Sequence, residues 1–322
     1  MTIEGQGSLA ERLAGVEEIE CVTPDLNGVP RGKVMTGEGF LSGRRLQLAR
    51  GVLLQCIMGG YPPARFYGSD DGDLALVAEP TQVHRLPWSN TPRAFAICDA
   101  QELDGTPSGL STRGLLKQVV ARYAAHGWQP VVATELEFFV FAPNTDPNEP
   151  FQAPLGPDGR RELGYSAFSV SSNNGLRPFF EDVYRCMDAL GLVRDTFMHE
   201  MGVSQFEINL LHGDPLLLAD QTFLFKHLLK EVALKHGLSG QVHRTAGDGQ
   251  TTEFGFRCEV GLSHAPRLTQ QQGRGYGKSE DVSEPHQTES RIPTLTEATH
   301  RTTDHLGVVA HHRAGNLLLL NH

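Results

Sequence analysis

The sequence of 322 residues lacks a long hydrophobic run, paired cysteines and an excess of positive charge. No apolar stretch approaches the ~18 residues that a membrane-spanning helix requires, which predicts no membrane partner. The five cysteines are scattered and form no C-x-x-C pair, which argues against a disulfide framework or a zinc site. A formal charge of −10 argues against nucleic-acid binding. Because the N-terminus also shows no secretory signal, these features predict a cytoplasmic protein.

The last quarter of the chain lacks regular hydrophobic periodicity. Residues 239–322 hold 8 of the 14 histidines but only 3 of the 24 aromatic residues. A segment of this composition buries too little apolar area to offset the entropy lost on ordering. We therefore expect residues 239–322 to form an atypical tail that is disordered or loosely packed. We also expect residues 1–16 to form a flexible N-terminus.

Residues 17–238 show the ordinary alternation of strand-like and helix-like patterns that is typical of an α+β protein. An Asn27-Gly28 turn predicts a hairpin near the start. The mixture of short strands predicts one domain over residues 17–108, and a second follows over 109–238. We expect strands at residues 19–23, 33–35, 74–78, 94–98 and 131–141, and helices at 113–125, 176–190 and 215–236.

Two glutamates interrupt an otherwise apolar strand pattern in the segment TELEFF. Glu135 and Glu137 are two residues apart, so the alternation of a strand places both on one face. Two like charges there repel each other and are costly to bury without a partner. A hard cation such as Mg²⁺ or Mn²⁺ would relieve that cost, since it prefers carboxylate oxygens. A solvated strand face, or pairing with Lys or Arg, explains the pattern equally well.

A second pair of glutamates flanks a turn in the segment HEMGVSQFEINL. Glu200 and Glu207 lie on either side of a glycine-containing turn between two apolar stretches. Strand–turn–strand geometry would aim both carboxylates at one point, although ordinary turn and edge charge is an alternative. We expect His199 to have a structural role and not to be a ligand.

These segments, together with DPLLLADQTFLFKHLLKEVALKHG, resemble successive motifs of the glutamine synthetase family. They are most similar to its γ-glutamylpolyamine (glutamate–putrescine) ligase branch. The segments PDLNGVPRGK and GSDDGDLALVAEP resemble the N-terminal β-grasp domain of that family. The resemblance covers about residues 17–238. It implies a β-grasp domain over 17–108 and the N-terminal part of a catalytic domain, with a curved antiparallel sheet and helices, over 109–238.

The resemblance also implies an activity and a set of ligands. In that family ATP phosphorylates the γ-carboxylate of glutamate, and ammonia or an amine displaces the phosphate. Carried over by position, Glu137, Glu200 and Glu207 match ligands of a first Mg²⁺ or Mn²⁺, and Glu135 matches a ligand of a second. Residues 56–60 have no acid where the family has an ammonium-binding aspartate, which favours putrescine or another polyamine over ammonia. The resemblance implies a homo-oligomer of stacked rings.

The sequence departs from the family after Leu238. The family continues with an H-x-H strand, which supplies a histidine to the second metal, and with a catalytic glutamate and several arginines. None of these motifs is found in residues 239–322. The catalytic domain is therefore predicted to be incomplete at its C-terminal end. The alternative to an active ligase is an inactive truncated or frameshifted remnant that keeps only part of the metal site.

Overall fold

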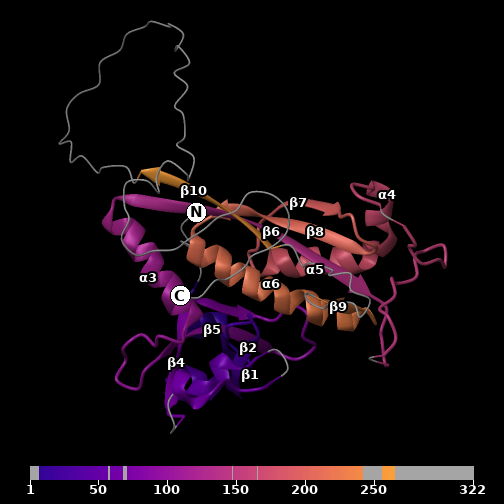
Figure 1. The fold of residues 1–322 in the computed structure, drawn as a ribbon. Coiled ribbons are helices and arrows are strands. Elements are labelled where there is room, and N and C mark those ends of the chain that lie inside the picture. Colours follow the sequence, from indigo (N-terminus) through magenta and orange to yellow (C-terminus); the bar gives the residue numbers. More distant parts are fainter. Residues whose placement is uncertain are drawn as a thin grey trace, which may run out of the picture. The chain divides into compact units, whose positions relative to one another are not determined.

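The computed structural model describes residues 7–56, 59–67, 71–146, 148–164, 166–241 and 256–264. The chain divides into a unit of residues 1–265, which contains all described residues, and a unit of residues 266–322. The first unit is a mixed α+β structure with two five-stranded sheets, and Figure 1 labels all of their strands except β3. The predicted fold class is confirmed in this coarse form.

The first sheet is built from residues 18–101. Its strands are β1 (Glu18–Pro24), β2 (Pro30–Thr36), β3 (Leu46–Ala49), β4 (Asp73–Arg85) and β5 (Arg93–Gln101), in the order β2-β1-β5-β4-β3. The pair β1–β5 is parallel and the other pairs are antiparallel. The predicted hairpin joins β1 to β2, and Gly28 takes the positive φ of 65° that its turn requires. Asp25 closes this turn by accepting hydrogen bonds from Asn27 N and Val29 N.

Short helical elements flank the strands of the first sheet. They are α1 (Leu9–Arg12), α2 (Gly37–Leu41), and the 3₁₀ turns η1 (Arg50–Leu54) and η2 (Ala64–Phe66). Helix α1 begins with a capping box formed by Ser8 and Glu11, inside the segment for which the sequence predicts flexibility.

The second sheet is antiparallel and lies around one long central strand. Its strands are β6 (Trp128–Phe141), β7 (Arg194–His199), β8 (Gln205–Gly213), β9 (Ser239–Gln241) and β10 (Phe256–His264), in the order β10-β6-β8-β7 with β9 also paired to β6. Strands β9 and β10 lie within residues 239–322, for which sequence analysis predicted a disordered or loosely packed tail. The other tail residues, 242–255 and 265–322, lie outside the described residues.

Three long helices accompany the second sheet and begin and end close to their predicted positions. They are α3 (Thr112–Ala125), α5 (Arg177–Ala189) and α6 (Pro215–Lys235), with the short α4 (Val170–Asn173) and η3 (Asn174–Leu176) before α5. Helix α6 begins where Asp214 accepts hydrogen bonds from Leu216 N and Leu217 N. It ends before Gly237, whose φ is 66°.

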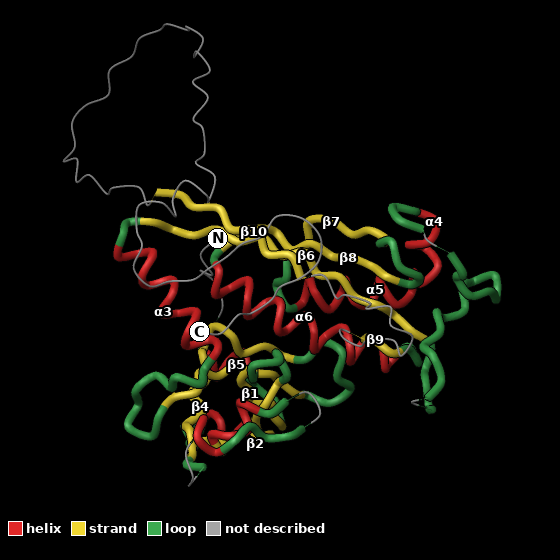
Figure 2. Tube along the Cα trace, in the orientation of Figure 1, coloured by secondary structure: helices red, strands yellow, loops and turns green. Residues whose placement is uncertain are grey.

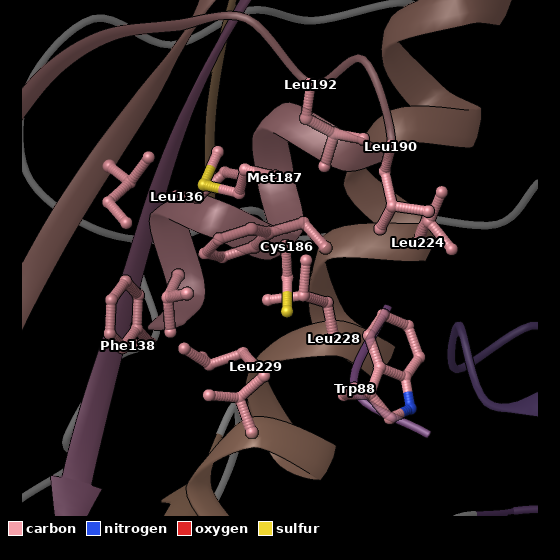
Figure 3. Packing of buried hydrophobic residues seen from close by; sticks show 14 of the residues in the cluster. Trp88, Leu136, Phe138, Cys186, Met187, Leu190, Leu192, Leu224, Leu228 and Leu229 are labelled. Atoms are coloured by element: carbon pink, nitrogen blue, oxygen red, sulfur yellow. The ribbon is translucent and has the colours of Figure 1, made fainter. Parts of the chain in front are cut away.

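The main hydrophobic core lies between the second sheet and helices α5 and α6, which run along one face of that sheet (Figures 1 and 2). On β6, Leu136 and Phe138 point into this core, on the side where Met187 of α5 and Leu229 of α6 lie (Figure 3). Because neighbouring side chains of a strand point to opposite faces, residues 135 and 137 face away from the helices. The packing of the helices therefore determines which face of the sheet carries the glutamates.

Candidate metal centre

Strands β6 and β8 bring the predicted glutamates of both segments onto one surface of the second sheet. Glu137 of β6 lies directly opposite Glu207 of β8, and Glu135 lies opposite Asn209. Glu135 and Glu137 are half-buried, whereas Leu136 between them is fully buried. Glu200 follows the last residue of β7, in the turn that leads into β8. The structure thus gathers the four predicted residues at one end of the β6–β8 pair.

Glu207 is the glutamate of this cluster whose pKa is raised by the charges of its neighbours. Its side chain is buried, with 6% of the residue exposed. Burial raises the pKa of Glu207, and the nearby charges of Glu200 and Glu135 raise it further, while a hydrogen bond from Asn209 opposes the shift. Within the described residues, neither Glu207 nor Glu200 forms a salt bridge to Lys, Arg or His. Negative charge is therefore concentrated around Glu207 and Glu200.

Two side-chain amides contact the carboxylates of the opposed pair. Gln205 Nε2 donates to Glu137 Oε2 at 2.9 Å, and Asn209 Nδ2 donates to Glu207 Oε1 at 2.9 Å. The same Asn209 nitrogen also donates to Thr196 Oγ1 at 2.9 Å. Sequence analysis did not identify either amide, because a Gln or an Asn in a strand gives no signal until the register is known.

A buried histidine holds the turn that carries Glu200. His199 Nδ1 lies 2.7 Å from Glu200 O, and His199 Nε2 lies 3.1 Å from Glu162 Oε2. Ser204 N donates to the same Glu162 oxygen at 2.8 Å, and Ser204 Oγ donates to Val140 O at 2.6 Å. Both ring nitrogens of His199 are thus occupied within the protein, as its predicted structural role requires. Glu162 is 37 residues from His199 in the chain, and sequence analysis did not identify it.

The donor set suits a hard divalent cation, since four carboxylates offer oxygen ligands of the type that Mg²⁺ and Mn²⁺ prefer. In the part of the chain that is described, however, no group of three or more His, Cys, Asp and Glu side chains is arranged to hold a metal ion. Two of the oxygens are instead directed to amide donors. Metal binding at this site therefore requires the carboxylates to turn toward a common point.

Two further sequence predictions concern the segment of residues 56–60 and the absence of a membrane-spanning helix. Residues 57 and 58, within the segment 56–60 on which the predicted preference for an amine depends, lie outside the described residues. No helix among the described residues has both the length and the apolar character needed to cross a bilayer.

One protein family matches the part of the chain that contains most of the second sheet and its helices. The catalytic domain of glutamine synthetase matches residues 109–250. This range begins at the predicted domain boundary and extends twelve residues past Leu238. It contains all four glutamates.

Proteins with similar sequences include ligases and synthetases of glutamate amides. Over 234 residues the chain is 29% identical to a glutamate–isopropylamine ligase of a Pseudomonas species, covering 70% of this chain and 50% of that protein. It is 29% identical over 222 residues to glutamine synthetase of Pyrococcus abyssi, covering 68% and 45%. It is 31% identical over 169 residues to a γ-glutamylethanolamide synthetase of Streptomyces coelicolor, covering 52% and 36%. The chain thus spans half or less of the length of these relatives.

Solved structures with the same fold include a glutamine synthase homolog, with a TM-score of 0.66 and 23% identity over 78% of this chain and 56% of that one. The ADP complex of GmaS superposes with a TM-score of 0.64 and 23% identity, covering 81% and 56%. At this level of identity the likeness establishes the fold alone.

Proposed function

Through residues 109–250 the chain is related to the glutamine synthetase family, and on this premise we propose that it carries the acidic metal-binding part of an ATP-dependent glutamate–amine ligase. The observation that supports this most is the opposition of Glu137 and Glu207 across β6 and β8, with Glu200 and Glu135 close enough to raise the pKa of Glu207. Like charges that approach each other in this way repel, and a bound divalent cation would offset that repulsion.

In this proposal Glu137, Glu200 and Glu207 hold a first divalent ion, and Glu135 contributes to a second. Bound ions of this kind supply positive charge that neutralises phosphate oxygens during phosphoryl transfer. Strands β6 and β8 carry the carboxylates of Glu135, Glu137 and Glu207, and the turn after β7 carries that of Glu200. Backbone pairing between β6 and β8 sets the separation of Glu137 from Glu207, and the bonds of His199 hold the start of the Glu200 turn.

The proposed nucleophile is a small organic amine. Two of the relatives are named for isopropylamine and for an ethanolamide product, which supports an amine in place of ammonia. A polyamine such as putrescine stays a prediction within this class. The β-grasp identity of the first sheet, the incomplete C-terminal end, the cytoplasmic location and the assembly into stacked rings also stay predictions.

A second candidate function is a metal-binding remnant without turnover. It is favoured by the sequence of residues 239–322, which has no H-x-H pair and none of the arginine motifs of the family. The two candidates share the metal site and differ in product formation. The reaction of purified chain with ATP, glutamate and a panel of ammonia, isopropylamine, ethanolamine and putrescine separates them. A γ-glutamyl product that disappears in Glu207→Ala supports the ligase, and metal binding without product supports the remnant.

We expect the purified chain to bind Mn²⁺ in isothermal titration, and Glu137→Ala and Glu207→Ala each to abolish that binding. The reason is that each substitution removes one of two directly opposed ligands. Glu181→Ala is a suitable control, because Glu181 is an exposed glutamate on α5 that pairs with Arg177. Binding that survives both strand substitutions, or that is equally weakened by Glu181→Ala, would contradict the proposed site.

A further inference from the structure

Two adjoining cavities lie beside the hairpin of residues 155–161, and none of the four candidate metal ligands lines either of them. The first cavity, of about 340 Å³, extends from this hairpin to Ser172 of α4. The second, of about 410 Å³, extends from Leu155 to Leu238 after α6. Each volume is in the range of about 300–1,000 Å³ that is typical of small-molecule sites. Four residues line both cavities: Pro154, Arg161, Gly175 and Leu176.

The second cavity has mostly apolar walls. They include the partly buried side chains of Leu176 and Leu238, which pack against the main hydrophobic core. Of the described residues that line this cavity, only Arg161 and His236 carry an ionisable side chain. His236 Nε2 lies 3.2 Å from Asp182 Oδ2 and is thus directed to that acid. Arg161 is therefore the charged side chain through which this cavity can select a ligand.

The guanidinium group of Arg161 has hydrogen-bond donors to spare. It donates from Nη1 to the backbone oxygen of Ala153, whereas a guanidinium carries five N–H donors in total. Throughout the described part of the chain, neither Arg161 nor the adjacent Arg160 forms a salt bridge to a carboxylate. The positive charge of this hairpin is therefore not neutralised by the residues around it.

The two acids that line the first cavity are bound to other groups. Glu162 Oε2 lies 3.1 Å from His199 Nε2 and accepts a hydrogen bond from Ser204 N at 2.8 Å. Asp158 Oδ1 accepts a hydrogen bond from the backbone N of Arg160 at 3.0 Å. Because these contacts engage both carboxylates, neither acid replaces a ligand at the Arg161 guanidinium.

The hairpin holds Arg161 in place between the two cavities. Leu155 and Arg161 form an antiparallel bridge, and Gly156 N donates to Arg160 O at 2.7 Å. The side chain of Arg161 is half-buried and is also fixed by its bond to Ala153. A donor group that is already ordered loses less conformational entropy when a ligand binds.

From these features we propose that the two cavities form one binding site for a small carboxylic acid with an apolar alkyl or aryl body. The carboxylate binds the spare N–H groups of Arg161, since a guanidinium matches a planar carboxylate through two parallel hydrogen bonds. The apolar body lies against Leu176 and Leu238. A phosphate ester fits less well, because its second negative charge meets the carboxylate of Glu162 in the first cavity. This site is separate from the candidate metal centre, and the inference does not rest on the proposed function.

The probe that tests this site is 4-phenylbutanoate, added to the purified chain in the presence of EDTA so that no metal ion attracts the carboxylate. Binding is followed by NMR of isotope-labelled leucine methyl groups. We expect saturable shifts of the methyl signals of Leu155, Leu176 and Leu238, with a dissociation constant of about 1 mM or tighter. The alcohol 4-phenylbutan-1-ol has the same apolar body without the charge. It is expected not to saturate the site at concentrations at which the acid does.

Arg161→Met is expected to weaken binding of 4-phenylbutanoate about 10–100-fold, because it removes hydrogen bonds to a charged group. Arg177→Met is the matched control. Arg177 is an exposed arginine at the start of α5, pairs with Glu181 and lines neither cavity. Its replacement should leave the affinity for the probe unchanged.

A second variant tests the space and keeps the charge. Gly175 lines both cavities, and a Cβ added there would meet no atom within 4 Å. Gly175→Leu is therefore expected to occupy part of the cavity and abolish binding, while circular dichroism and the melting temperature stay those of the wild type. Gly164→Leu adds the same side chain at a glycine that also has open space around it but lines neither cavity. It should bind the probe as the wild type does.

Several results would overturn the proposed site. They are the absence of saturable binding to the wild type, binding of the alcohol as tight as that of the acid, and wild-type affinity in Arg161→Met or in Gly175→Leu. Equal weakening by Arg177→Met would overturn it as well. Each of these results leaves the candidate metal centre standing, because binding of Mn²⁺ there is measured without the probe.

Discussion

Replacing Arg113 with alanine is expected to lower the free energy of unfolding by about 3–5 kcal/mol, because it leaves a buried carboxylate without its partner. Arg113, in the first turn of α3, contacts Asp220 of α6 through two hydrogen bonds, both of 2.9 Å. It also pairs with Asp99 of β5. The side chains of Arg113 and Asp220 are only 4% and 5% exposed. Arg113 thus links Asp99 of the first sheet to Asp220 of α6, the helix that packs against the second sheet.

Lys117→Ala provides the matched control. Lys117 is one helical turn further along α3 and pairs with the same Asp99, but its side chain is 37% exposed. An exposed pair contributes about 0–1 kcal/mol, so this variant should unfold close to the wild type. The measurement is urea-induced unfolding followed by circular dichroism. An Arg113→Ala protein that loses no more stability than Lys117→Ala would show that the buried pair does not hold the two sheets together.

In the absence of metal, Glu207→Gln is expected to stabilise the protein at pH 7, by about 0.5–2 kcal/mol, while abolishing Mn²⁺ binding. The carboxylate of Glu207 is buried next to other acids, and the amide of glutamine carries no charge to desolvate. With Mn²⁺ at 100 times its dissociation constant, the wild type should gain about 2.7 kcal/mol, and the variant should gain nothing. The order of stability of the two proteins is therefore expected to reverse when metal is added.

The pH dependence of this variant follows from the raised pKa of Glu207 in the folded state. A raised carboxyl pKa means that the folded protein binds the proton more tightly than the unfolded chain. The resulting stabilisation is complete below the unfolded-state pKa of about 4.3 and is lost as the pH rises through the folded-state pKa. The advantage of Glu207→Gln should therefore be small at pH 4 and grow toward pH 7. A difference that does not change with pH, or a variant less stable than the wild type at pH 7, would contradict this explanation.

Strand periodicity was sufficient to predict the face on which Glu135 and Glu137 lie. Their alternation with Leu136 and Phe138 depends only on the geometry of a single strand, and the structure shows the apolar residues buried against the helices. The bounds of α6 were predictable for a similar reason, since Asp214, Pro215 and Gly237 are local signals for the start and end of a helix.

Features that depend on pairing between distant segments were not predictable in this way. The opposition of Glu137 to Glu207 and the amide contact of Gln205 to Glu137 require the register of β6 and β8, which are 68 residues apart at that contact. Strand β10 was missed because residues 256–264 lie in a segment without clear periodicity, and pairing with β6 provides its backbone partners. Pairing with a distant strand thus stabilises a β-strand that the local sequence pattern does not indicate.

The central claim is that Glu137, Glu200 and Glu207 hold a first divalent cation and that Glu135 contributes to a second. Anomalous X-ray diffraction from crystals of the chain soaked in Mn²⁺ tests it most directly, because the signal locates the ion independently of the protein phases. The account predicts a peak at about 2.0–2.6 Å from carboxylate oxygens of Glu137, Glu200 and Glu207, and a second ion, where bound, next to Glu135. A crystal with bound Mn²⁺ elsewhere and no peak among these glutamates would contradict it.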